Sequence, residues 1–85
     1  SVSQECCRAM VTNLAKISKT KLNLAITGIA GPSGGSKNKP VGLVYIGIKR
    51  EKKIKIKKFL FVNQNRNNIR KKSVNKSLEL IKEFI

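Results

Sequence analysis

TGIAGPSGG at residues 27–35, followed by KPVGLVY at residues 39–45, decides how this sequence is interpreted. The two segments join an apolar run that ends at Ile26 to a second apolar run that begins at Val41. Glycine adopts positive φ and lets the backbone approach a ligand closely, and loops lined by backbone N–H groups often bind anions. The stretch therefore predicts either a plain connection between two strands or a loop whose backbone contacts a ligand.

Two common nucleotide-binding motifs do not fit this loop. No Gly-Lys-Ser/Thr follows the glycines, so the phosphate-binding loop of nucleoside-triphosphate hydrolases is excluded. The apolar run after the loop reads as a strand, whereas a dinucleotide-binding loop must open a helix. The glycines therefore indicate a strand–loop–strand connection.

The flanking sequence predicts five elements. Ser3 precedes apolar residues at helical spacing, which predicts a helix over about residues 3–18 with Ser3 as its N-cap. Strands are expected at 22–27, at 41–48 and after residue 52, and a second helix after residues 63–65. The run at 41–48 is nearly all apolar, as in a central strand covered on both faces. We expect an α/β fold, a layered α-β-β-β-α arrangement with a small mixed sheet.

The same spacing predicts which side chains face the core. In the third strand, residues 53–57 alternate, which places isoleucines inside and lysines in solvent, and the break at 58–62 indicates either a bulge or a strand covered on both faces. The first helix should bury Cys6, Met10, Val11, Leu14 and Ile17. The last helix should bury Ile69, Ser73, Ser77, Leu80, Ile81 and Phe84.

The chain is strongly basic, with a formal net charge of +15 over 85 residues. Such a charge suggests nucleic-acid binding. However, lysines occur in every segment, and the four aromatic residues lie in apolar runs or on an apolar helix face, where they read as core. We predict no specific nucleic-acid partner, only non-specific attraction to polyanions at low salt. The sequence contains no apolar run of membrane-spanning length and no signal-peptide pattern, so we expect a cytoplasmic protein with no membrane partner.

No catalytic constellation can be built from these residues. The sequence has no His and no Asp, and its four glutamates lie at a helix start, in a turn and on the last helix. Cys6 and Cys7 are adjacent, which on a helix disfavours a disulfide between them, and without a second pair they predict no metal site. We therefore expect no catalytic residue, no metal and no cofactor in this chain.

The motifs resemble the C-terminal domain of the CinA family, a nicotinamide-nucleotide amidase domain. That family carries Thr-Gly-Ile-Ala-Gly-Pro-x-Gly-Gly and then Lys-Pro-Val-Gly-x-Val-Tyr-Ile, which match residues 27–35 and 39–46. Residues 61–70 are similar to the family's Phe-x-Gly-Asp-Arg-x-x-Ile-Arg segment, with Gln64 and Asn65 in place of Gly and Asp. The helix start at residues 2–5 matches as well. The resemblance covers residues 1–85, and we interpret the chain as a single partial CinA C-terminal-like domain.

The resemblance implies hydrolysis of nicotinamide mononucleotide to nicotinic acid mononucleotide and ammonia. The family's nucleophilic serine lies in a Glu-Ser-x-Thr-Gly-Gly segment, which this chain does not contain. The resemblance therefore implies a fragment that supplies substrate-binding loops and is inactive alone. Thr27 would support the site at a strand end, Arg66 would pair with a phosphate, and the loop glycines would surround the substrate; these are Gly28, Gly31, Gly34 and Gly35.

Other interpretations stay open at this stage. Thr27 could cap a strand end and Arg66 could lie on a solvated helix. The partner of the chain is either the missing N-terminal half of the domain or a second copy. A function from another class is a non-catalytic basic binding module, or a gene remnant with non-specific nucleic-acid affinity. Because too few elements exist to cover the strand at 41–48, we expect the chain alone to self-associate or stay partly unfolded.

Overall fold

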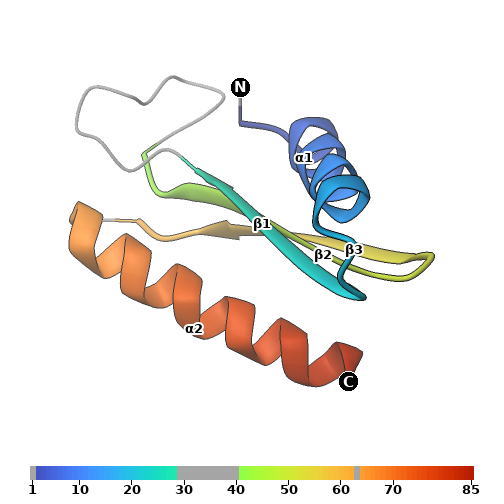
Figure 1. The fold of residues 1–85 in the computed structure, drawn as a ribbon. Coiled ribbons are helices and arrows are strands. Elements are labelled where there is room, and N and C mark those ends of the chain that lie inside the picture. The colour runs from blue at the N-terminus through green and yellow to red at the C-terminus, as the bar shows by residue number, and fades with distance from the viewer. Residues whose placement is uncertain (1, 29–40, 63) are drawn as a thin grey trace.

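The computed structural model describes residues 2–28, 41–62 and 64–85. Helix α1 (Gln4–Ser18) is followed by strands β1 (Leu22–Gly28), β2 (Leu43–Arg50) and β3 (Lys53–Leu60), and helix α2 (Arg66–Phe84) ends the chain. The strands form one sheet in the order β1-β2-β3. Helix α1 lies on one face of this sheet and α2 on the other (Figure 1). The predicted layered α-β-β-β-α arrangement is confirmed.

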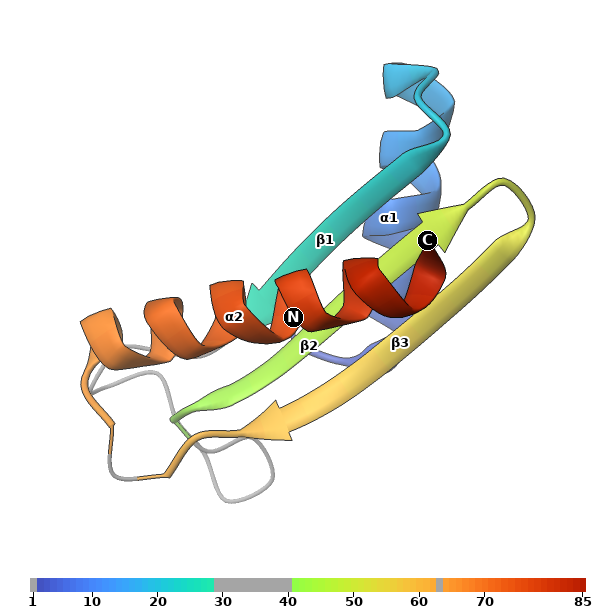
Figure 2. The same cartoon turned by 90° about the horizontal axis from the view of Figure 1, so that it is seen from below.

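All pairing between the described strands is antiparallel, where a mixed sheet was expected. β2 and β3 are joined by a two-residue turn, and so short a connection can join only antiparallel neighbours. A parallel neighbour needs a long crossover connection. Figure 2 shows the three strands running side by side, with α2 crossing in front of them and α1 behind.

Strand β2 is the centre of the core. Val44, Ile46 and Ile48 are almost fully buried on the face toward α2, while Leu43 and Gly47 are buried on the face toward α1. Both faces of this strand are therefore covered, as its apolar sequence predicts.

Helix α1 begins where expected, but its core face is rotated from the predicted one. The Ser3 hydroxyl oxygen accepts a hydrogen bond of 3.0 Å from the backbone N–H of Cys6, as an N-cap does. The buried residues are Cys7 and Val11, whereas Met10, Leu14 and Ile17 are 44%, 39% and 79% exposed. The cause lies at Gly47, which has no side chain and lets Cys7 approach the sheet. The predicted stripe of Cys6, Met10, Leu14 and Ile17 thus flanks the contact.

Strand β3 contains neither of the features proposed for its second half. Its register with β2 runs unbroken from Lys53 to Leu60, so no bulge is present. Leu60 is half exposed, so the second half is not covered on both faces either. Instead the apolar residues change face: Ile56 contacts the α1 side, while Phe59 packs in the core beside α2.

Helix α2 follows the prediction closely. The Asn65 side chain accepts a hydrogen bond of 2.8 Å from the backbone N–H of Asn68 and caps the helix. Its buried residues are Ile69, Ser73, Ser77 and Leu80. Within residues 2–28, 41–62 and 64–85, neither helix combines the length and the apolar character that a membrane span requires.

Candidate functional site

The end of β1 holds a buried hydroxyl that finds no partner among the described residues. Thr27 is the next-to-last residue of β1, and its Oγ1 is buried without a hydrogen bond to any described residue. An unsatisfied buried polar group costs about 1–3 kcal/mol. Such a group is tolerated where a ligand or another protein segment supplies the partner. Because side chains alternate along a strand, Thr27 faces the α1 side of the sheet, next to Tyr45 of β2.

Gly28 brings the β1 backbone against β2. It lies opposite Val44 in the antiparallel register. A Cβ at Gly28 would approach the Val44 Cγ2 to 3.0 Å and the Leu43 carbonyl oxygen to 3.2 Å. A side chain would also enter the groove that begins at this point. The glycine is therefore explained by close packing at the strand end, whether or not a ligand binds there.

A shallow groove of about 320 Å³ connects this strand end to α2. Ile26 and Gly28 line it from β1, and Ile69, Arg70 and Val74 line it from the first three turns of α2. Arg70 is the charged residue among the described lining. The groove therefore combines an apolar floor with one guanidinium group, an arrangement that suits a flat apolar ring attached to an anionic group.

The first two turns of α2 carry positive side chains and no negative ones. Arg66 is the first residue of the helix and is exposed, one turn before Arg70 and outside the described lining of the groove. The first turn contains no acidic residue. A helix N-terminus carries unpaired N–H groups and a partial positive charge, which favour anions. Arg70 was not among the predicted site residues, although the same segment contains it four residues after Arg66, on the same side of a helix.

The predicted site residues are thus placed only in part. Thr27 and Gly28 lie together at the strand end, and Gly28 shares the groove with Arg70. Arg66 lies one turn before Arg70, exposed and outside the described lining of the groove. Gly31, Gly34 and Gly35 lie outside the described residues.

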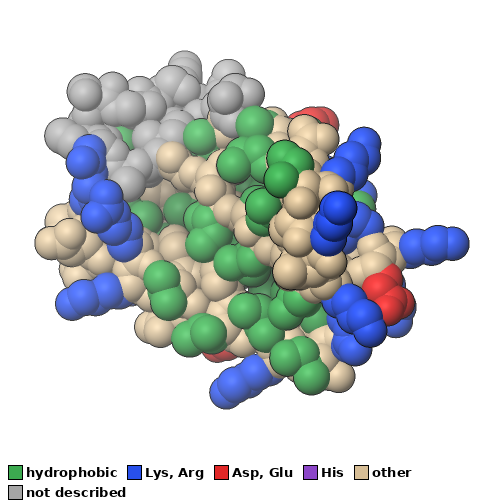
Figure 3. All heavy atoms as spheres, in the orientation of Figure 1, with side chains coloured by type: hydrophobic (Ala, Val, Ile, Leu, Met, Phe, Trp, Pro, Cys, Tyr) green, Lys and Arg blue, Asp and Glu red, His purple; other side chains and the backbone are tan. Residues whose placement is uncertain are grey.

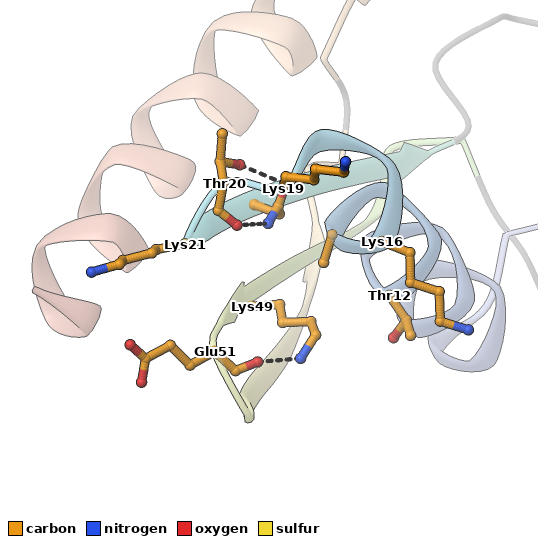
Figure 4. Close-up of a pocket in the computed structure, with 9 residues that line it drawn as sticks. Thr12, Lys16, Lys19, Thr20, Lys21, Lys49 and Glu51 are labelled. Carbon is orange, nitrogen blue, oxygen red and sulfur yellow. Dashed lines mark hydrogen bonds between the residues drawn. The ribbon is translucent and has the colours of Figure 1, made fainter.

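A larger pocket, about 530 Å³, lies at the C-terminal end of α1, beside the start of β1 (Figure 4). It is lined by several lysines, but Lys16, Lys19 and Lys21 point away from one another in this view. Lys49 donates to the carbonyl oxygen of Glu51, and the buried Asn23 is already bonded to Ser18 and Thr20. The buried amide is already bonded and the lysines do not converge, so the pocket is a solvated surface rather than an anion site.

The two cysteines differ in exposure. Cys7 is fully buried, and this burial, with a smaller contribution from Cys6, raises the pKa of its thiol. The thiolate is the reactive form of cysteine, so Cys7 is poorly suited to act as a nucleophile. Among the described residues, no three His, Cys, Asp or Glu side chains gather as a metal site would require.

Comparison with known proteins agrees with the motifs. The CinA C-terminal domain family matches residues 1–85. The chain is 41% identical over 85 residues to a putative competence-damage inducible protein of Caldanaerobacter subterraneus subsp. tengcongensis, covering all of this chain and 20% of that protein. It is 51% identical over 61 residues to the protein of the same description in Clostridium perfringens, covering 72% and 15%.

The fold matches a solved structure as well. The competence/damage inducible protein CihA of Agrobacterium tumefaciens superposes with a TM-score of 0.89 at 33% identity, over 94% of this chain and 49% of that one. The chain therefore belongs to the CinA C-terminal domain family. It spans about a fifth of the curated relatives it matches and about half of the solved chain.

Proposed function

We propose that this chain supplies the substrate-binding half of a nicotinamide-nucleotide amidase domain that acts on nicotinamide mononucleotide. The observation that carries the proposal is the apolar groove at one end of the sheet, which Gly28 lines from β1 and Arg70 lines from the arginine-bearing start of α2. The Thr27 hydroxyl, which has no partner among the described residues, lies at the same strand end on the other face of the sheet. A pyridine mononucleotide offers a matching set of groups: a phosphate, a ribose and a flat ring that carries an amide.

Each described group has a role that its chemistry allows. Arg66 and Arg70, next to the helix N-terminus, would bind the phosphate, because guanidinium groups pair with phosphate oxygens in a bidentate manner. The apolar lining from Ile26 and Val74 would contact the ring or ribose. The Thr27 hydroxyl would donate to or accept from a polar substrate group. Cys6 and Cys7 are both free thiols, which suits a reducing compartment, and we place the protein in the cytoplasm.

The hydrolysis itself needs a further group. Water replaces the amide nitrogen, so nicotinic acid mononucleotide and ammonia leave in equal amounts, and this route requires an activated hydroxyl as nucleophile. We assign that hydroxyl to the complementary half of the domain. Residues 1–85 alone should therefore release no ammonia from nicotinamide mononucleotide above background. Turnover by the chain alone that Thr27→Ala abolishes would show that the nucleophile is Thr27 instead.

Substrate binding is best tested by calorimetry in a complex that contains the complementary half. Arg66→Ala should weaken nicotinamide mononucleotide binding by about 1.5–3 kcal/mol, roughly tenfold to a hundredfold, as expected for a lost charged hydrogen bond. Arg70→Ala should have an effect of the same order. Lys82→Ala is the matched control, because it removes one positive charge near the other end of the same helix.

Nicotinamide riboside, which lacks the phosphate, separates the roles of the groups. If the arginines bind phosphate, their variants should weaken mononucleotide binding and leave riboside binding unchanged. Equal affinity of all three variants for the mononucleotide would show that both arginines are solvated surface residues that do not bind the phosphate. Binding that follows only net charge, for RNA as much as for the nucleotide, would favour a basic binding module.

A further inference from the structure

One edge of the sheet carries a row of lysines. Strand β3 holds four of them, Lys53, Lys55, Lys57 and Lys58. Phe59 lies opposite the buried Val44 in the register with β2, so alternation places Phe59 and the lysines at positions 53, 55 and 57 on the face toward α2. Successive lysines on this face are about 6.7 Å apart along the strand. They therefore form a line of positive charge at the edge opposite β1.

Two aromatic rings lie at the end of β3, and α2 places a lysine over each. The rings of Phe59 and Phe61 are stacked, with their centroids 5.9 Å apart and their planes 5° from parallel. Lys76 lies over the ring of Phe59 and Lys72 over that of Phe61, each with its Nζ 5.9 Å from the ring centroid. Both rings are half-buried, so they border the core, whereas their apolar surroundings in the sequence predict enclosed core residues. This surface, the β3–α2 strip, consists of Lys53, Lys55, Lys57, Phe59, Phe61, Lys72 and Lys76.

Glutamates balance only part of the charge on the β3–α2 strip. Lys55 forms an ion pair of 3.1 Å with Glu83, and Lys76 forms one of 3.3 Å with Glu79. The four side chains are 40–63% exposed, and ion pairs at such exposure contribute little to stability, so an incoming anion can replace either glutamate. The other three lysines of the strip form no salt bridge to a described carboxylate group. Five lysines against two glutamates leave a net charge of +3 on this surface.

The positive charge of the molecule is therefore not spread evenly over its surface. Figure 2 shows β3 as the edge of the sheet opposite β1, with α2 crossing in front of the strands. Figure 3 shows the β1 side, where hydrophobic side chains gather across the middle and lysines and arginines lie mostly at the margin. The β3 edge thus concentrates charge in a way that lysines scattered along the sequence do not predict.

A strip of this composition suits a single-stranded nucleic acid. Lysine ammonium groups replace the counterions of its phosphates, and its unpaired bases stack on aromatic rings. Residues 53–61 span about 27 Å of extended chain, which gives room for several nucleotides. An ammonium group 5.9 Å from a ring is near the outer limit of a cation–π contact, so a base can take its place over Phe61 and leave Lys72 to a phosphate. An acidic polypeptide would use the lysines and leave the rings without a role.

We propose that the β3–α2 strip binds single-stranded nucleic acid without sequence preference, with its lysines on the phosphates and Phe61 against a base. A surface of lysines and phenylalanines contacts phosphates and ring faces, which every sequence presents. The non-specific attraction that the net charge predicts thereby has a defined place on the molecule. The groove lined by Gly28 and Arg70 lies on the other flank of α2, so the proposal does not depend on the amidase activity.

Fluorescence anisotropy of a labelled oligouridylate of about 12 nucleotides tests this proposal. Affinity is measured at several salt concentrations, in the complex that contains the complementary half of the domain. The double variant Lys57→Gln with Lys72→Gln should weaken binding at least tenfold. It should also make the dependence of log K on log salt shallower by about 1.4, because each contact to a single strand contributes about 0.7. The matched control, Lys16→Gln with Lys21→Gln, removes the same charge at the C-terminal end of α1 and should keep the salt dependence.

Phe61→Leu separates stacking from charge. It should weaken binding of the oligouridylate at least fivefold and keep the salt dependence, because a lost stacking contact releases no counterion. Unchanged affinity would overturn the proposal, since lysines alone would then explain the binding. The lysine variants replace exposed side chains and leave the core as it is, so they remain informative if Phe61→Leu alters the fold.

Two competitors complete the test. Saturating nicotinamide mononucleotide should not displace the oligouridylate, because the groove and the strip lie on different flanks of α2, so the strip is tested whether or not the groove binds the nucleotide. Displacement would place the oligouridylate in the groove and overturn the proposal. Polyglutamate of matched charge should compete more weakly than unlabelled oligouridylate. Equal competition would make an acidic polypeptide the occupant, and equal losses in the two double variants would show that net charge alone attracts the strand; either result would overturn the proposal.

Discussion

Replacing Gly47 by alanine tests how closely α1 packs on the sheet. A Cβ at Gly47 would lie 2.9 Å from the Sγ of Cys7 and 2.9 Å from the Cδ1 of Ile56, far inside ordinary van der Waals contact. Ile56 is half-buried and can turn its terminal methyl group away. Cys7 is fully buried on a short side chain, so it can give way only if α1 moves.

The expected loss follows from two opposing effects. Overpacking a core costs about 1–3 kcal/mol. Exchanging glycine for alanine restricts the unfolded chain and returns about 0.4–1 kcal/mol. We therefore expect Gly47→Ala to lower the free energy of unfolding by about 1–2 kcal/mol. Cys7→Ala removes the Sγ and makes room for the new methyl group, so the double variant should be about 1 kcal/mol more stable than the sum of the two single changes.

Urea denaturation followed by circular dichroism measures these differences. If the chain alone shows no cooperative transition, the same variants are compared in the complex with the complementary half. Cys6→Ala is the control partner, since Gly47 contacts Cys7 and not its neighbour. Additivity of Gly47→Ala and Cys7→Ala within about 0.5 kcal/mol would refute the packing argument, as would an equal coupling with Cys6→Ala.

Three other changes test separate parts of the fold. Gly42→Ala should lower the free energy of unfolding more than Gly47→Ala does. Gly42 has a φ of +95°, and a Cβ there would collide with the carbonyl oxygen of Phe61, a backbone atom that cannot turn aside. An equal or smaller loss of unfolding free energy in urea would contradict this. Burial raises the pKa of Cys7. The free energy of unfolding should therefore be highest below the ordinary thiol pKa and fall as the pH rises from that value toward the folded-state pKa. Cys7→Ala should reduce this fall at alkaline pH, and Cys6→Ala should leave it. Asn65→Ala should cost about 1 kcal/mol as a lost N-cap, while Asn65→Asp should keep the cap and gain about 0.3–1 kcal/mol from the helix dipole; a more stable alanine variant in thermal melts would argue against the cap.

The elements could be predicted from sequence because each carries a strong local signal. Ser3 and Asn65 mark helix starts through their own hydrogen bonds to the backbone. The apolar run of β2 indicates a strand covered on both faces, and the spacing from Ile69 to Leu80 identifies the core face of α2. These features depend on residues close together in the chain.

The errors arose where a distant residue decides the outcome. The buried face of α1 centres on Cys7 because Gly47, forty residues away, leaves space for it. The helical spacing alone predicts that Met10 and Ile17 are buried just as well. In β3 the apolar residues change face because α1 covers the side of Ile56 while α2 packs on the side of Phe59. In the candidate site, Arg70 lines the groove only because α2 crosses the sheet near Gly28, and no local pattern reports that crossing.

The tight turn between β2 and β3 has a consequence for how the chain folds. Their paired residues run from Arg50 and Lys53 to Leu43 and Leu60, so they lie 3 to 17 residues apart in the chain. The residues of α1 and α2 that pack on β2 lie about 25 to 40 residues away from it. Contacts between near neighbours form first because they lose the least chain entropy on closing. The hairpin should therefore exist briefly with both apolar faces of β2 bare. During that interval we expect the lysines of β3 to repel other nascent hairpins, so that their charge protects the chain while it is still folding.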